Sequence, residues 1–302
     1  MILLPASEFS IEELTDAYNR TRIDYLIPMP MNPGRLQEYI TLYDVDLSRS
    51  FVVIADDSII GLGMLGVRPE MGWITRLGVL PDGRRQGVGN VILERLLEEA
   101  ARHDLPVVWL EVIQGNTPAH ELFRKHLFQE TRELIVARRP PGSARNMSAV
   151  MTARKAHYLQ HNEAIELHCQ RQERLNWLNS VESMRNIRPS AAASSGDQPI
   201  GALPYELPRL SGIWVEFQDG SQGWGTYQAT TLQLKHINVE VIRGNPTRTT
   251  TNLLEFMHRL HASQDAVVEN IPEDERWTGF QQAGYFEVFR RIEMVRESPE
   301  SA

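Results

Sequence analysis

The sequence predicts an α/β protein made of two similar halves in tandem, each a mixed, mostly antiparallel sheet flanked by helices. Three observations predict this class. Residues 1–139 show the order strand, two helices, a three-strand meander, and then helix, strand, helix and strand. A glycine-containing loop lies between the last strand of the meander and the next helix. A similar order of elements recurs, imperfectly, in residues 213–295.

The first half carries clear local signals for its elements. Residues 1–4 are expected to form a short strand. Ser10 is expected to cap a helix that runs to about Asn19, because Glu13 stands at the capping-box position three residues later. Apolar spacing and turn residues predict helices at residues 35–42, at about 87–102 and after Asn116, and strands at 51–55, 59–65, 73–79, 107–112 and 134–138.

A glycine loop, Arg84-Arg85-Gln86-Gly87-Val88-Gly89, joins the strand at residues 73–79 to the helix at 87–102. Glycines at the start of a helix let a ligand approach backbone N–H groups that have no intrahelical partner. The helix dipole and the two arginines favour phosphate oxygens at such a place. A glycine-lined turn that only caps the helix is the alternative. A dinucleotide-binding fold is disfavoured, because its glycine loop follows the first strand.

The second half repeats the elements but not the loop. Both halves place an aromatic residue five positions after a phenylalanine, Phe128 after Phe123 and Tyr285 after Phe280. Chance similarity is the alternative, because strand–helix repeats are common. Residues 243–249 hold one glycine and a proline, which cannot supply the same run of free N–H groups. The elements expected here are strands at residues 213–217, 225–229, 237–241, 266–269 and 288–295, and helices at 176–186 and 253–260.

Residues 1–139 resemble the GCN5-related N-acetyltransferases (GNAT) in the order and spacing of their motifs. Arg84, Gly87 and Gly89 fill the family signature Arg/Gln-x-x-Gly-x-Gly/Ala. The preceding strand ends in Leu77–Pro81, as the family's fourth strand does. The family's second motif is matched by Asn116, Ala119, Leu122 and Phe128, and its usual tyrosine is here Phe123.

The resemblance implies two tandem GNAT folds, with the coenzyme site in residues 1–143 and a degenerate copy in residues 144–302. The boundary is expected near Pro140–Ser143, a punctuated stretch. Acetyl-coenzyme A is the implied co-substrate, with its pyrophosphate on the amides of residues 85–89 and its pantetheine arm along residues 77–79. No metal is implied. The implied coenzyme-binding residues are Leu77, Gly78, Val79, Arg84, Arg85, Gln86, Gly87, Val88, Gly89 and Asn116, the last of which is alternatively a helix N-cap.

In the mechanism that the resemblance implies, the acceptor amine attacks the thioester directly, and a backbone N–H near Leu77 steadies the oxyanion. Glu111 is the candidate base, since relatives carry a catalytic glutamate at this place; an ordinary outward-facing carboxylate is the alternative. Where other members place a base on the fourth strand, this chain has Trp73. Phe123 cannot protonate the departing thiolate, so water or another donor has to act, and His120 is one candidate. Residues suggested for the acceptor wall are Tyr25, Asp44 and Asp46.

Composition limits the classes of function. The 302 residues carry a net charge of −8, which disfavours a nucleic-acid partner and suits a cationic amine, either a small molecule or a peptide. No apolar run approaches the roughly 18 residues of a membrane span, and residues 1–5 lack the features of a signal peptide. The single cysteine, Cys169, excludes an intramolecular disulfide and is compatible with the cytoplasm. A monomer or a homodimer is expected.

Three functions fit these observations. The first is an N-acetyltransferase that acts on a primary amine. The second is a non-catalytic acyl-coenzyme A-binding or sensor protein, which the phenylalanine at position 123 motivates. The third is a structural or interaction protein built of two such folds, which the intact glycine loop disfavours.

Overall fold

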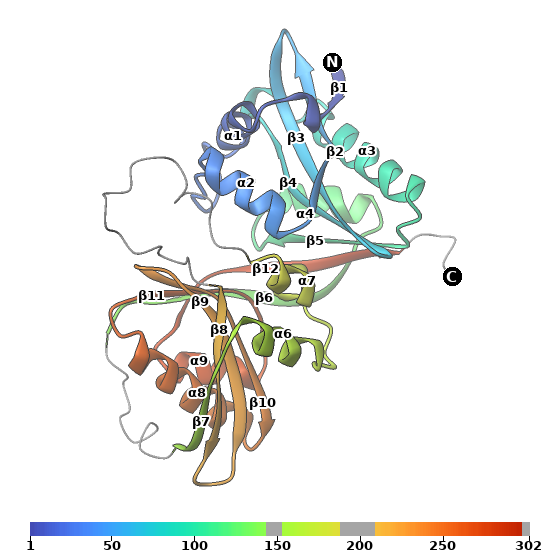
Figure 1. Cartoon of the computed structure of the whole chain (residues 1–302). Coiled ribbons are helices and arrows are strands. Elements are labelled where there is room, and N and C mark those ends of the chain that lie inside the picture. Colours follow the sequence, from blue (N-terminus) through green and yellow to red (C-terminus); the bar gives the residue numbers. More distant parts are fainter. Residues whose placement is uncertain (143–152, 188–208, 298–302) are drawn as a thin grey trace. The chain divides into compact units, whose positions relative to one another are not determined.

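The computed structural model describes residues 1–142, 153–187 and 209–297 (Figure 1). The chain divides into two compact units. The first contains Met1–Arg132 and the stretch that begins at Ile292, and the second contains Glu133–Arg291. The boundary expected between residues 143 and 144 lies outside the described residues.

The first unit is a mixed, mostly antiparallel sheet flanked by helices, as predicted. Strands β1 to β4 pair antiparallel, and β4 pairs with β5 in parallel. A parallel pair needs a crossover, and α3 supplies it. In spatial order the strands are β1 (Ile2–Pro5), β2 (Val45–Ala55), β3 (Ser58–Arg68), β4 (Met71–Val79) and β5 (Val107–Ile113), followed by parts of β12 (Phe286–Glu297) and β6 (Gln129–Arg139).

The helices of the first unit cover both faces of this sheet. α1 (Ile11–Arg20) and α2 (Pro33–Leu42) lie on one side and α3 (Val88–Arg102) on the other, and α4 (Thr117–Lys125) follows β5 (Figure 1). The predicted capping box of α1 is confirmed, since Ser10 Oγ accepts the N–H of Glu13 at 3.2 Å and Glu13 Oε2 accepts the N–H of Ser10 at 2.8 Å. The buried face of α3 is formed by Val88, Ile92, Leu93, Leu96, Leu97, Glu99 and Ala100.

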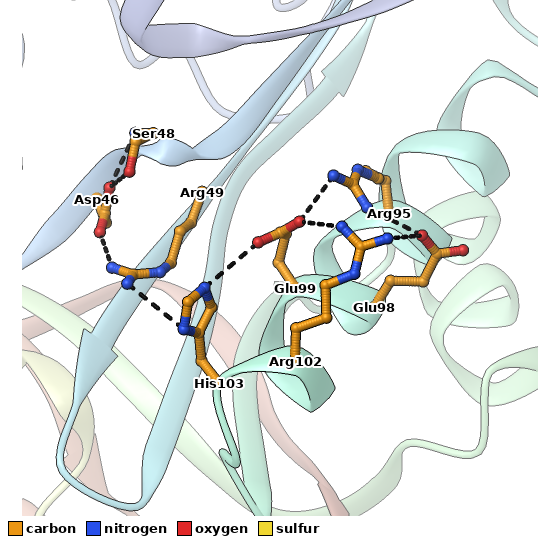
Figure 2. Close-up of polar contacts among 8 residues, drawn as sticks. All are labelled: Asp46, Ser48, Arg49, Arg95, Glu98, Glu99, Arg102 and His103. Carbon is orange, nitrogen blue, oxygen red and sulfur yellow. Dashed lines mark hydrogen bonds and ion pairs between the residues drawn. The ribbon is translucent and has the colours of Figure 1, made fainter.

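A polar network holds the end of α3 that is farther from the glycine loop (Figure 2). At its centre is the Glu99 carboxylate, which is paired with Arg95 at 2.7 Å and with Arg102 at 2.8 Å and lies 3.6 Å from the His103 ring. Arg49 of β2 donates to His103 Nδ1 at 3.5 Å. The Arg49–His103 hydrogen bond therefore links this end of α3 to β2.

The second unit repeats the fold of the first. β8 to β10 form an antiparallel meander, β10 pairs in parallel with β11, and α8 makes the crossover. The predicted tandem fold is thus confirmed. In spatial order its strands are part of β6, β11 (Asp265–Pro272), β10 (Gln233–Arg243), β9 (Gln222–Ala229), β8 (Leu210–Phe217) and β7 (Ala153–Leu159). Its helices are α6 (His161–Cys169), α7 (Val181–Arg185), α8 (Pro246–Leu260) and α9 (Glu275–Gln282).

The single helix predicted at residues 176–186 is wrong. A 3₁₀ turn at Trp177–Asn179 and α7 are separated by Ser180, whose backbone is extended. Asn176 accepts the N–H of Asn179, and Ser180 accepts that of Ser183. Side chains of this kind accept backbone N–H groups in conformations other than a continuous helix. A 3₁₀ turn and a short α-helix, each with its own N-cap, therefore replace the single helix.

The last strand completes the first unit. Met294 of β12 is fully buried in the apolar core that includes α3 and β5. Glu293, also buried, accepts hydrogen bonds from Thr131 Oγ1 at 3.0 Å and Arg132 Nε at 2.9 Å. Residues from the end of the chain therefore stabilise the unit formed by its beginning.

Candidate active site

One cavity of about 570 Å³ lies wholly within the first unit. Its wall combines the segment after α1, the end of β4, the start of α3 and the face of α4. Of the ten residues predicted to bind coenzyme, nine line it and Gln86 does not. Those nine are Leu77, Gly78, Val79, Arg84, Arg85, Gly87, Val88, Gly89 and Asn116.

The start of α3 presents backbone N–H groups to this cavity. Gly87 is the N-cap residue with φ at 82°, and no side chain caps the helix there. The N–H groups of Val88 and Gly89 belong to the first turn, which has no intrahelical acceptors. A Cβ on Gly87 would meet nothing within 4 Å. In the second unit, by contrast, the side chain of Asn245 accepts the N–H of Arg248 at 2.9 Å and caps α8.

The end of β4 supplies a second row of backbone groups. Its parallel pairing with β5 covers Met71–Ile74 and then stops. A register shift in the β3–β4 pairing follows at Arg76, whose φ is 54°. In the part of the chain that the structure describes, Gly78 and Val79 pair only with β3. Beyond Ile74 this part of β4 therefore has no strand partner on its β5 side, where an extended ligand can add, although the Leu77 and Val79 carbonyls already accept hydrogen bonds from Arg22 and Arg84.

Glycine at position 78 permits the segment after α1 to approach β4. A Cβ there would lie 2.6 Å from Thr21 Oγ1 and 2.9 Å from Arg22 Nη1. Arg22 Nη2 donates to the Leu77 carbonyl at 3.4 Å, and its guanidinium carbon lies 4.1 Å from the centre of the Tyr18 ring. Burial lowers the pKa of Arg22, and the neighbouring tyrosines oppose that shift.

Arg84 fixes the loop rather than extending into the cavity as a free cation. Its two terminal nitrogens donate to the carboxylate of Asp24, each at 2.6 Å, and Nε donates to the Val79 carbonyl at 3.2 Å. These hydrogen bonds raise the pKa of Arg84 and lower that of Asp24. Gln86 also bonds locally, since its Nε2 donates to the Asp82 carbonyl at 2.8 Å.

Asn116 is both a helix cap and part of the cavity wall. Its Oδ1 accepts the N–H of Ala119 at 3.5 Å, which orients the amide at the start of α4. Its Nδ2 then donates to the hydroxyl of Tyr25 at 3.2 Å. The two alternatives considered for this residue are therefore geometrically compatible.

Glu111 lies outside this cavity, on the face of the sheet where α2 packs. Trp73 Nε1 donates to Glu111 Oε2 at 2.7 Å, and the Trp73 side chain is only 2% exposed. The ring of Trp73 packs near those of Tyr39 and Tyr43, with centroids 6.1 and 5.9 Å away. Trp73 therefore orients the Glu111 carboxylate, a role that the sequence did not reveal. The available signal was chemical, because a buried indole N–H needs an acceptor.

The remaining candidates lie elsewhere. Phe123 is buried against Phe128 and does not line the cavity. His120 is bonded to Glu130 at 2.9 Å. Asp44 pairs with Arg68 at 2.7 Å, and Asp46 accepts from Ser48 at 2.5 Å and pairs with Arg49. Of the three residues suggested for the acceptor wall, Tyr25 alone lines the cavity.

The described residues contain neither a candidate membrane span nor a candidate metal cluster. None of their helices combines the length and apolarity needed to cross a membrane. Within the same residues, no group of three or more histidine, cysteine, aspartate or glutamate side chains is arranged to hold a metal ion.

Part of the chain matches a known protein family. Residues 11–128 match the model of the acetyltransferase (GNAT) family. Ribosomal protein bS18-alanine N-acetyltransferase of Escherichia coli (strain K12) is 37% identical over 54 residues, which are 18% of this chain and 36% of that enzyme. The chain therefore spans little more than a third of the length of this relative.

Two solved structures are similar over nearly the whole chain. A GCN5-related N-acetyltransferase from Sphaerobacter thermophilus has a TM-score of 0.67 and 14% identity, covering 98% of this chain and 95% of that one. A tandem GNAT protein from the clavulanic acid biosynthesis pathway has a TM-score of 0.61 and 13% identity, covering 98% of each chain. At this identity the likeness shows the fold alone. Residues 11–128 therefore match a GNAT acetyltransferase domain, and the chain as a whole shares the fold of a tandem GNAT protein.

Proposed function

We propose that the first unit transfers the acetyl group of acetyl-coenzyme A to a primary amine, by direct attack within a ternary complex. The observation that carries this proposal is the cavity, which contains both the start of α3, where no side chain caps the helix, and the part of β4 that no longer pairs with β5. The first favours phosphate oxygens, and the second can hydrogen-bond an amide-containing chain such as pantetheine. Asn116, at the start of α4, would hold the inner end of that chain.

The chemistry follows from this placement. A free alkylamine is largely protonated near neutral pH, with a pKa of about 10, so a base is required. The ammonium would first lose one proton to solvent, and Glu111 would take a second proton from the neutral amine as its nitrogen bonds to the thioester carbon. Trp73 would hold the Glu111 carboxylate in position. A backbone N–H near Leu77 would stabilise the oxyanion. Placement of both substrates in one complex would supply much of the acceleration.

The acceptor is either a small-molecule amine or the amine of a peptide. The name of the Escherichia coli relative specifies an alanine of a ribosomal protein as its acceptor. Peptides with a free N-terminus therefore belong in an acceptor screen, together with polyamines and aminosugars. Appearance of free coenzyme A thiol with one class of acceptor would identify it.

Coenzyme binding is tested with Gly87→Glu. Calorimetry should show one acetyl-coenzyme A site per wild-type chain. The variant should bind at least about tenfold more weakly, which corresponds to a loss of ~1.4 kcal/mol in binding free energy. The new carboxylate would meet the pyrophosphate at a backbone position that already disfavours side chains. Gly220→Glu, at φ 80° in the second unit, is the matched control and should bind normally. Two equivalent sites, or equal binding by both variants, would contradict the proposal.

A non-catalytic acyl-coenzyme A-binding or sensor function is the alternative. The observation in its favour is Phe123, which offers no proton and is buried in the core. Tight coenzyme binding with no transfer to any acceptor in the screen would support this alternative.

Two accompanying proposals concern the cellular setting. We place the protein in the cytoplasm, because its one cysteine, Cys169, is an exposed free thiol that needs no oxidising compartment. Cell fractionation tests this. A monomer or homodimer is proposed, and analytical ultracentrifugation distinguishes them.

A further inference from the structure

Tyr25 brings a phenol into the cavity from the segment between α1 and α2. Two contacts locate it. Its hydroxyl accepts from Asn116 Nδ2 at 3.2 Å, and its ring centre lies 5.1 Å from the guanidinium carbon of Arg22, which bonds the Leu77 carbonyl. Tyr25 therefore lies beside Asn116 at the start of α4, and Arg22 connects it to Leu77, in the part of β4 that no longer pairs with β5.

This position is the acyl end of the proposed coenzyme site. Gly89, at the phosphate end, faces Leu122, and a Cβ there would lie 3.4 Å from Leu122 Cδ2. Asn116 precedes Leu122 by six residues, which corresponds to about 9 Å along a helix. The phenol thus lies at the Asn116 end of α4 rather than at the Leu122 end, and Arg22 links its ring to the carbonyl of residue 77, near which the thioester is proposed to bind.

The hydrogen-bond arrangement leaves the phenol proton available. Asn116 Oδ1 is held by the N–H of Ala119, so Nδ2 is the atom that points to Tyr25 and donates. The Tyr25 oxygen is an acceptor in that bond. Among the hydrogen bonds of the described residues, none uses the Tyr25 proton. A phenol ordinarily keeps this proton at neutral pH and can donate it.

We propose that Tyr25 protonates the departing coenzyme A thiolate, a role that Phe123 cannot perform. This inference rests on the proposed acetyl transfer. The amine nitrogen bonds to the thioester carbon and gives one proton to Glu111. When the carbon–sulfur bond breaks, its electron pair stays on sulfur, which takes the proton of Tyr25. The phenolate then regains a proton from solvent and Glu111 releases one, so the products are the N-acetylated amine and neutral coenzyme A thiol.

The first test compares two leaving groups in the full chain. With acetyl-coenzyme A, Tyr25→Phe should lower kcat by about 10²-fold, as expected for loss of a general acid. With an acetyl thioester of an acidic thiophenol, which departs without a proton, the variant should react as fast as wild type. Tyr39→Phe is the matched variant, since its hydroxyl bonds Thr75 at 2.6 Å and it does not line the cavity. Its effect should be the same for both thioesters.

The second test needs no acceptor. A hydrogen bond from Tyr25 to bound thiolate would lower the pKa of the thiol of coenzyme A, so an ultraviolet titration of the complex should show a higher thiol pKa in Tyr25→Phe than in wild type. An unchanged thiol pKa, or equal losses of rate with both thioesters, would overturn the role of Tyr25. If wild type acetylates no amine, the proposed function fails, and that result is distinct from a failure of this inference in an active enzyme.

Discussion

Individual side chains in the first unit are held by partners far away in the sequence. Arg84 donates hydrogen bonds to Asp24, which lies 60 residues away in the sequence. Glu111 accepts a hydrogen bond from Trp73, which lies 38 residues away. In both cases a charged group that could face a ligand is given a fixed orientation by the fold. Preorganisation of this kind is what the proposed acetyl transfer would require, because misplaced groups contribute little to the rate.

Replacing Glu111 by glutamine tests its role as the base. We expect Glu111→Gln to lower kcat by roughly 10²–10⁴-fold, because the amide cannot accept the proton, while acetyl-coenzyme A affinity stays unchanged. The acidic limb of the pH–rate profile should also disappear. Steady-state kinetics and calorimetry on the same preparations measure both quantities.

The Trp73 contact provides a control for this interpretation. Trp73→Phe removes the N–H that orients Glu111 and should lower kcat by a smaller factor. Combined with Glu111→Gln it should add little, because the two residues act together. Full turnover by Glu111→Gln on a good amine would assign proton removal to another group.

At the scale of elements, α3 has two ends with different roles. Its glycine-lined start is open to the cavity, whereas its other end is tied to β2 through the network around Glu99 (Figure 2). This division predicts that changes at the two ends affect different properties.

Glu99→Gln should reduce stability without reducing coenzyme affinity. The Glu99 side chain is 10% exposed and pairs with Arg95 and Arg102, so its neutralisation removes two ion pairs at a nearly buried carboxylate and should cost about 1–3 kcal/mol. Glu98, which is 58% exposed on the same helix, is the control, and Glu98→Gln should cost less than about 1 kcal/mol. Urea unfolding measures both. Equal effects, or a loss of coenzyme binding in Glu99→Gln, would contradict this division.

At the scale of the whole molecule, the first unit depends on the end of the chain. Residues from Ile292 belong to it, with Met294 in its core. The two halves of the sequence therefore cannot be separated by a single cut without removing a buried strand segment from the first unit.

Substitution of Met294 tests this dependence. Met294→Ala should destabilise the first unit by about 2–5 kcal/mol, the usual range for emptying a core site. Hydrogen exchange in β5 and thermal unfolding with and without acetyl-coenzyme A locate the loss. Phe286→Ala, on the exposed start of the same strand, should have a much smaller effect. Destabilisation confined to the second unit would contradict the assignment of this strand.

The sequence by itself determined the order of the elements in the first half, the tandem repeat and the place of the glycine loop. The cap at Ser10 and the start of α3, expected at about Gly87 and found at Val88, depend on spacings of a few residues, so a linear pattern contains them. The single helix predicted across Ser180 was wrong, because apolar spacing alone does not reveal that Asn176 and Ser180 each cap a separate short segment.

Only the tertiary structure decided which distant residues meet. The pairing of Trp73 with Glu111, the capture of Arg84 by Asp24, the approach of Tyr25 to Asn116 and the placement of Met294 in the first unit each join segments that no local periodicity relates. Such contacts arise because buried polar groups must find partners and apolar faces must be covered. Those requirements are met in three dimensions, by whichever segment the fold brings near.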